Sequence, residues 1–216
     1  MNISTLFIFS TVISLVPIII SFLFWNKQPK ELRILAFYLS LGLMFSIAMW
    51  ILGSQQINNL WMMHLFTPIQ FGLLMWIFSF WFEGPIRSVA LLSIPIFTLF
   101  WVIMLLFFES FTQFNTYTRP VEALFFIVVA GYMLYKTNKE DAETIFRMPR
   151  FWVASGTLIY FSGMILLYAV SNNLLAMSME TLRMVWLTIQ TSSQIMSNLL
   201  FIGGFLCLSP RLHLQQ

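Results

Sequence analysis

The sequence predicts an all-α, polytopic membrane protein whose seven transmembrane helices form a single bundle over residues 1–216. Hydrophobic residues make up 59% of the 216 positions and charged residues only 9%, whereas soluble domains carry about 25% charged residues. The apolar residues also occur in runs, each close to the roughly 20 residues that cross about 30 Å of hydrocarbon. The predicted spans are 5–25, 34–52, 60–82, 88–108, 118–135, 151–171 and 184–208.

The basic residues lie mostly on one side of these spans. Nine of them follow the first, third, fifth and seventh spans, namely Lys27, Lys30, Arg33, Arg87, Lys136, Lys139, Arg147, Arg150 and Arg211, while Arg119 and Arg183 lie on the other side. Short loops rich in Lys and Arg stay in the cytoplasm, which predicts an outer N-terminus and an inner C-terminus in the cell inner (cytoplasmic) membrane. No basic residue precedes the first span and no small-residue cleavage site follows it, so we interpret it as a retained helix.

The first two spans contain few polar residues. Ser10 and Ser14 lie in the outer half of the first span, before Pro17, and such hydroxyls usually bond to their own helix backbone. In the second span, Gly42 and Ser46 are spaced i, i+4. This spacing is typical of helices whose backbones approach closely, so we expect it to serve packing within the bundle.

The third and fifth spans bring polar residues to their outer ends, and the fourth does not. His64, Thr67 and Gln70 share one third of the circumference of the third helix. The fourth span is almost wholly apolar, so we expect it at the periphery. The fifth opens with Arg119 and Glu122. Glu122 is either a functional intramembrane acid or an i, i+3 partner of Arg119 at the headgroup level.

The sixth and seventh spans are predicted to pack closely. Small residues of the sixth span, Gly156 and Gly163 among them, suit close contact with the seventh, and Tyr168 lies nearer the outer end. The seventh span is too polar to face lipid. Its polar residues fall on one helix face that must look into protein or a wet cavity, namely Gln190, Thr191, Gln194, Ser197 and Asn198. We expect the other helices to pack around this element.

Several function classes lack the residues that they need. All four lysines lie at or beyond inner span ends, so a retinal Schiff base has no lysine. His64 is the one histidine inside a span and Cys207 is the one cysteine, which is too few for a zinc or cysteine-metal site. No phosphate loop, nucleophile elbow or His-Glu-x-x-His motif occurs. We therefore expect no cofactor, no metal and no enzyme, and the net charge of +3 reflects topology and not nucleic-acid binding.

Some motifs resemble those of known membrane proteins. The residues are Phe151-Trp152 with Gly156, Leu158 to Gly163, Ser171-Asn172 and Phe114 to Thr118. They are similar to small uncharacterised seven-helix membrane proteins of bacteria. Leu60-Trp61, Pro68 and Phe80-Trp81 look like the membrane sensor portions of some bacterial histidine kinases. The resemblance implies a sensor-like bundle, and since the chain ends at Gln216, we expect a separate signalling partner.

The sequence leaves three functions open. The first is a sensor or receptor that binds a small ligand in the outer half of the bundle and acts through a cytoplasmic or membrane partner. The second is a small solute transporter of three plus one plus three helices, and the third is a membrane assembly subunit. The expected site is a polar cavity between the third, fifth, sixth and seventh helices, formed by His64, Gln70, Glu122, Tyr168, Gln190 and Gln194.

Overall fold

The computed structural model describes residues 3–139, 142–174 and 179–207, all of them in helices or their connections. The long helices are α1 (Ile3–Leu23), α2 (Lys30–Ser54), α3 (Leu60–Ser79), α4 (Gly84–Phe107), α5 (Thr118–Thr137), α7 (Pro149–Leu174) and α8 (Met179–Leu206). A 3-10 turn, η1 (Trp25–Lys27), and a short helix, α6 (Ala142–Ile145), lie in connections. The all-α prediction is confirmed. The predicted span end Leu208 and the basic residue Arg211 lie outside the described residues.

Four of the described helices, α2 to α5, are long and apolar enough to cross a membrane by length and composition. In α1 the apolar helical stretch Ile8–Leu23 is shorter. The helices differ from the predicted spans mainly at their ends. Helix α2 starts at Lys30, directly after Pro29, and α3 stops at Ser79, shortly before Gly84 takes a positive φ of 56°. That left-handed conformation suits glycine and turns the chain into α4.

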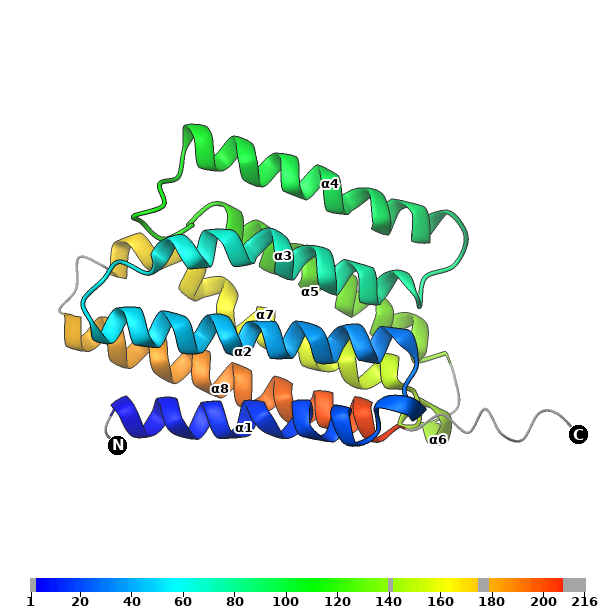
Figure 1. Cartoon of the computed structure of the whole chain (residues 1–216). Helices are drawn as coiled ribbons and strands as arrows, with labels where there is room; N and C mark the ends of the chain where they lie inside the picture. The colour runs from blue at the N-terminus through cyan, green and yellow to red at the C-terminus, as the bar shows by residue number, and fades with distance from the viewer. Residues whose placement is uncertain (1–2, 140–141, 175–178, 208–216) are drawn as a thin grey trace, which may run out of the picture.

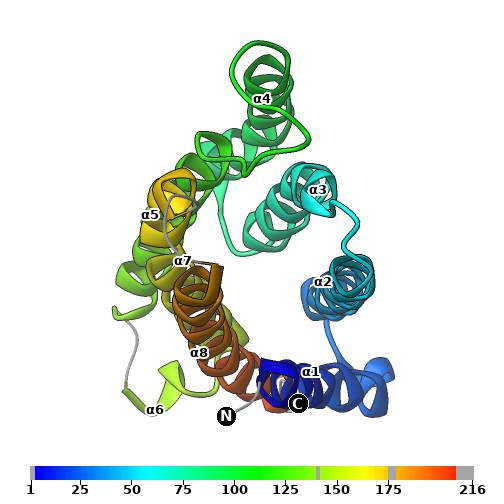
Figure 2. The same ribbon diagram turned by 90° about the vertical axis from the view of Figure 1, so that its left-hand side faces the viewer.

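Six of the seven long helices form a ring (Figure 2), which has one half of α1, α2 and α3 and another of α5, α7 and α8. In the first half α2 packs between α1 and α3, and in the second half α7 packs between α5 and α8. Helix α1 closes the ring against α8, whereas α3 and α5 meet over a smaller contact. Helix α4 lies outside the ring, against α3. The peripheral position expected for the fourth helix is therefore confirmed.

The expectation that the other helices pack around the last one is wrong. Helix α8 is a member of the ring and packs against α7 and α1. Its polar face needs polar atoms or water beside it, and the space inside the ring is a cavity, described below. The centre of the bundle is thus partly hollow, and no helix occupies it.

The two ends of the bundle differ in charge. We call the end where α1 begins the N-terminal end, which also carries the α2–α3 and α4–α5 connections (Figure 1). The other end carries the α1–α2, α3–α4 and α5–α7 connections, and we call it the basic end. Its described basic residues are Lys27, Lys30, Arg33, Arg87, Lys136, Lys139, Arg147 and Arg150.

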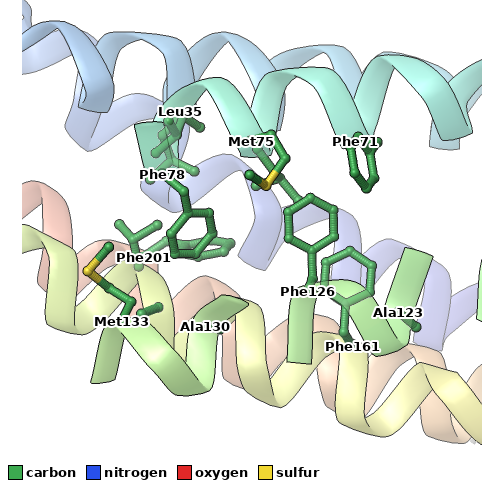
Figure 3. Close-up of a cluster of buried hydrophobic side chains, with 14 of the residues drawn as sticks. Leu35, Phe71, Met75, Phe78, Ala123, Phe126, Ala130, Met133, Phe161 and Phe201 are labelled. Atoms are coloured by element: carbon green, nitrogen blue, oxygen red, sulfur yellow. The ribbon is translucent and has the colours of Figure 1, made fainter. Parts of the chain in front are cut away.

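Aromatic side chains form the centre of a buried hydrophobic cluster between α3, α5 and α7 (Figure 3). Phe126 of α5 lies at its centre and is fully buried. Its ring centroid lies 5.2 Å from Phe71, 6.4 Å from Phe78 and 4.9 Å from Phe161. These rings join α3, α5 and α7 across the two halves of the ring.

Helices α7 and α8 approach closely because glycines lie in their contact and leave room for side chains of the other helix. A Cβ atom added to Gly156 would lie 2.7 Å from the Phe201 ring, and one added to Gly163 would clash with Ser193. Neither position has room for a side chain. The predicted close packing of the sixth span against the seventh is confirmed.

Gly42 and Ser46 do not have the packing role expected from their spacing. A Cβ atom added to Gly42 would meet only the Phe66 ring, at an ordinary 3.5 Å. Both residues line the cavity inside the ring. The small side chains therefore enlarge a cavity, and they do not bring two helix backbones together.

Candidate ligand-binding site

The ring encloses a cavity of about 350 Å³. Its wall comes from α1, α2, α3, α7 and α8, with Arg119 as the contribution of α5. The cavity extends from Trp50 and Asn59 near the N-terminal end down to Leu39 and Phe201, beside the aromatic cluster. A volume of this size is within the range of small-molecule pockets.

The polar face of α8 forms one wall of the cavity. All five residues predicted to share this face line it, namely Gln190, Thr191, Gln194, Ser197 and Asn198. Two of them are held by α1, since Gln194 Nε2 and Asn198 Nδ2 donate to Ser14 Oγ at 2.9 and 3.0 Å. The Ser14 hydroxyl donates in turn to the Ser10 carbonyl at 2.8 Å. The prediction that this face looks into protein or a cavity is confirmed.

Aromatic side chains surround the upper part of the cavity, nearer the N-terminal end. The Trp186 ring stacks on Phe114 with centroids 4.9 Å apart, and Trp186 Nε1 donates to Gln190 Oε1 at 2.6 Å. Tyr168 lies beside Trp186, with centroids 6.5 Å apart. Trp186, Gln190 and Tyr168 all line the cavity, so this part offers flat apolar surface next to hydrogen-bonding groups.

Arg119 belongs to a buried polar cluster in the wall. Its Nη1 donates to Gln70 Oε1 of α3 at 2.8 Å and to Glu122 Oε2 at 3.2 Å. The guanidinium also lies over the Tyr168 ring, 5.3 Å from its centroid, a favourable cation–π geometry. Glu122 and Gln70 are completely buried, and Arg119 is 5% exposed.

Three buried atoms of this cluster have no hydrogen-bond partner among the described residues, namely Gln70 Nε2, Arg119 Nε and Glu122 Oε1. Buried polar groups are nearly always satisfied by protein or by ordered water. Of the three residues, only Arg119 lines the cavity. Arg119 Nε is itself buried, so the part of Arg119 that a ligand could reach is the portion of the side chain that lines the cavity.

His64 belongs to a different contact, between α3 and the α4–α5 connection. Its Nε2 donates to the Gln113 carbonyl at 3.0 Å, and its Nδ1 lies 3.7 Å from Glu109 Oε2. The Glu109 carboxylate accepts hydrogen bonds from the backbone N–H groups of Tyr117 and Thr118, at 2.8 and 2.9 Å. An acidic group in this position stabilises the N-terminus of α5. His64 does not line the cavity.

The structure thus separates the six residues predicted to form the site. Tyr168, Gln190 and Gln194 line the cavity, whereas His64, Gln70 and Glu122 do not. Gln70 and Glu122 lie behind Arg119 and hold it. The site also includes residues of α1 and α2, such as Ser14 and Tyr38, which sequence reasoning did not assign to it.

The wall combines amides and hydroxyls, aromatic rings and the Arg119 guanidinium. Among the residues that the structure describes, no group of three or more His, Cys, Asp or Glu side chains is placed to hold a metal ion. No protein family, curated protein or solved structure matches this chain. The fold and the site therefore define only the structural class of the protein, which is a bundle of apolar helices with a partly polar internal cavity.

Proposed function

We propose that the protein is a receptor-like module of a bacterial inner membrane, which binds a small molecule in the cavity and acts through a separate cytoplasmic or membrane partner. The observation that carries the proposal is the cavity, whose polar and aromatic wall comes from helices far apart in the sequence. Hydrogen bonds between membrane helices contribute only about 0.6 kcal/mol each on average. Bundle stability is thus a weak reason to collect so many polar side chains around an internal space.

The membrane orientation in this proposal follows the charge difference between the two ends. The seven long helices, six in the ring and α4 outside it, would suit seven crossings, and the basic end suits the cytoplasmic side. In this orientation the N-terminal end, near which Trp50 and Asn59 line the cavity, would face the outside. A receptor for an external ligand needs a cavity that opens only to the outside, and the proposal assigns the closure on the inner side to the cluster around Phe126.

The seam between α3 and α5 supports a route from ligand to partner. The two halves of the ring meet over a smaller contact here than at α1 and α8. Two hydrogen bonds bridge the seam near the cavity, from Arg119 Nη1 to Gln70 Oε1 at 2.8 Å and from Asn115 Nδ2 to Thr67 Oγ1 at 2.9 Å. A ligand that binds to Arg119 would alter the hydrogen bond between Arg119 and Gln70, and so shift the two halves of the ring relative to each other.

A solute carrier is the second candidate, because the ring has an internal symmetry in its contacts. If α1, α2 and α3 are exchanged with α5, α7 and α8 in that order, the contacts within the first half coincide with those within the second. The contact between α1 and α8 then coincides with the contact between α5 and α3. Carriers built from two parallel halves place their substrate between them. Receptor and carrier differ in one respect: a carrier must expose its cavity to both sides.

Sided labelling of the cavity tests the proposal. Single cysteines replace Ser46 in the cavity, Gln113 at the N-terminal end and Lys139 at the basic end, each in a Cys207→Ser background. The impermeant reagent 2-sulfonatoethyl methanethiosulfonate is applied to intact cells and to inside-out vesicles. We expect Ser46→Cys and Gln113→Cys to react only in cells and Lys139→Cys only in vesicles.

Three other labelling patterns would contradict the proposal, each in a different way. Reaction of Ser46→Cys in both preparations would establish the carrier. Reaction of Lys139→Cys in cells, with Gln113→Cys protected there, would show the opposite orientation. If Ser46→Cys reacts in neither preparation while both end positions react as expected, the cavity is closed to water and both functions lose their site.

A further inference from the structure

The cavity contains one charge among the described residues of its wall. The lining side chains are otherwise Ser, Thr, Asn, Gln, Tyr, Trp and apolar residues, and Arg119 is the exception. A buried charge in a low-dielectric setting is costly unless it is paired. Glu122 supplies the partner at 3.2 Å, and Arg119 is nevertheless the charged residue of the pair that lines the cavity.

The cluster behind Arg119 fixes the position of its guanidinium. Gln70 and Glu122 both accept from Nη1, and Tyr168 lies against the face of the group. Arg119 held in this way is part of the cavity wall. Preorganised guanidinium donors are well suited to carboxylate, sulfonate and phosphate oxygens.

Glu122 does not cancel the field of Arg119 inside the cavity. The carboxylate is fully buried and is not part of the wall, whereas the guanidinium is. A group in the cavity is thus nearer to the cation than to the anion. Because the interaction energy falls with distance and is little screened in a buried site, the nearer charge dominates.

From these observations we infer that the ligand of the cavity is a small, water-soluble organic anion whose acidic group pairs with Arg119. This inference rests on the proposed function, since it concerns the same cavity. The remainder of the ligand meets the aromatic rings of Tyr168 and Trp186 and the amides of Gln190 and Gln194. Such a wall suits a compact body with both flat apolar surface and hydrogen-bonding groups.

Charged thiol reagents of similar size measure this preference directly. The Ser46→Cys protein, in the Cys207→Ser background, is reconstituted in phosphatidylcholine nanodiscs. Its modification rate is measured with 2-sulfonatoethyl methanethiosulfonate and with its trimethylammonium analogue, and each is divided by the rate at the exposed control Gln113→Cys. We expect the normalised sulfonate-to-ammonium ratio to be roughly tenfold or more in favour of the sulfonate.

The double variant Arg119→Gln, Glu122→Gln removes both charges of the pair and keeps hydrogen-bonding side chains in place. We expect it to bring the ratio close to one. A ratio near one, or in favour of the ammonium reagent, in the protein with Arg119 intact would overturn the anion assignment and leave the cavity as a site for another ligand. Since that measurement needs no folded double variant, the inference is testable even if the variant is unstable.

A third arm separates soluble anions from lipid headgroups. The ratio is measured again in nanodiscs that contain phosphatidylglycerol, normalised to Gln113→Cys in the same membrane. An unchanged ratio supports the soluble ligand. Loss of the sulfonate preference only with phosphatidylglycerol would assign the acidic group to a lipid and overturn the soluble ligand. No reaction at Ser46→Cys with either reagent would contradict the proposed function itself.

Discussion

Replacement of Arg119 by leucine is expected to destabilise the bundle by about 3–5 kcal/mol, the range seen when one partner of a buried ion pair is removed. The substitution leaves the Glu122 carboxylate fully buried without its 3.2 Å partner and deprives Gln70 of its donor. The free energy of unfolding can be measured in mixed detergent micelles for the whole chain. The double variant Arg119→Leu, Glu122→Leu should recover most of the loss, because no buried charge then remains.

The exposed ion pair at the other end of the bundle provides a matched control. Lys136 Nζ lies 3.7 Å from Glu83 Oε1, and the two side chains are 32% and 85% exposed. Exposed pairs contribute about 0–1 kcal/mol, so Lys136→Leu should change stability little. If Arg119→Leu costs no more than Lys136→Leu, or if the double variant is as unstable as the single one, the Arg119–Glu122 pair is not the coupled unit described here.

Replacement of Phe126 by alanine should cost about 3 kcal/mol or more, the lower bound for truncating a buried phenylalanine. Its ring contacts Phe71, Phe78 and Phe161 at the centre of the cluster that joins α3, α5 and α7. Lipid tails cannot enter the space left behind, so the dispersion contacts of the neighbouring rings are lost.

The matched control for Phe126 is Phe37→Ala on α2, where the side chain is 56% exposed. We expect a change below about 0.5 kcal/mol there, as for substitutions away from packed sites. Equal losses at Phe126 and Phe37, measured by the same unfolding assay, would show that the aromatic cluster does not hold the two halves together.

The sequence predicted features that depend on a single helix. The prediction of a polar face on the last helix was correct because its polar residues recur at intervals of three and four positions. This spacing places their side chains on one side of the helix, whichever helices are its neighbours. Gly156 and Gly163 were also predicted correctly, and each lies where an added Cβ would clash with α8. The peripheral position of α4 was predictable because its span is almost wholly apolar and has few polar side chains to bury.

Features that depend on which helices are neighbours were not predictable in this way. Ser14 is 180 positions from Gln194, to which it is hydrogen-bonded, and no local pattern links them. His64 and Gln70 share a face of α3, yet one reaches Gln113 and the other Arg119. The charges of Arg119 and Glu122 were visible in the sequence, but the structure alone shows that Arg119 lines the cavity and Glu122 lies behind it.

A cysteine scan of α2 from Leu35 to Trp50 is the most direct test of a water-filled cavity inside the ring. Each variant, in the Cys207→Ser background and in nanodiscs, is treated with 2-sulfonatoethyl methanethiosulfonate, and its rate is measured by intact-protein mass spectrometry. We expect fast reaction at Gly42, Ser46 and Met49, which line the cavity. We expect none at Leu35, which is fully buried in the core, or at Met44, which is 66% exposed on the outer face of the ring. Cysteines at Gly42 and Ser46 that are as unreactive as the one at Leu35, or a cysteine at Met44 that reacts as fast as they do, would contradict the cavity on which this account depends.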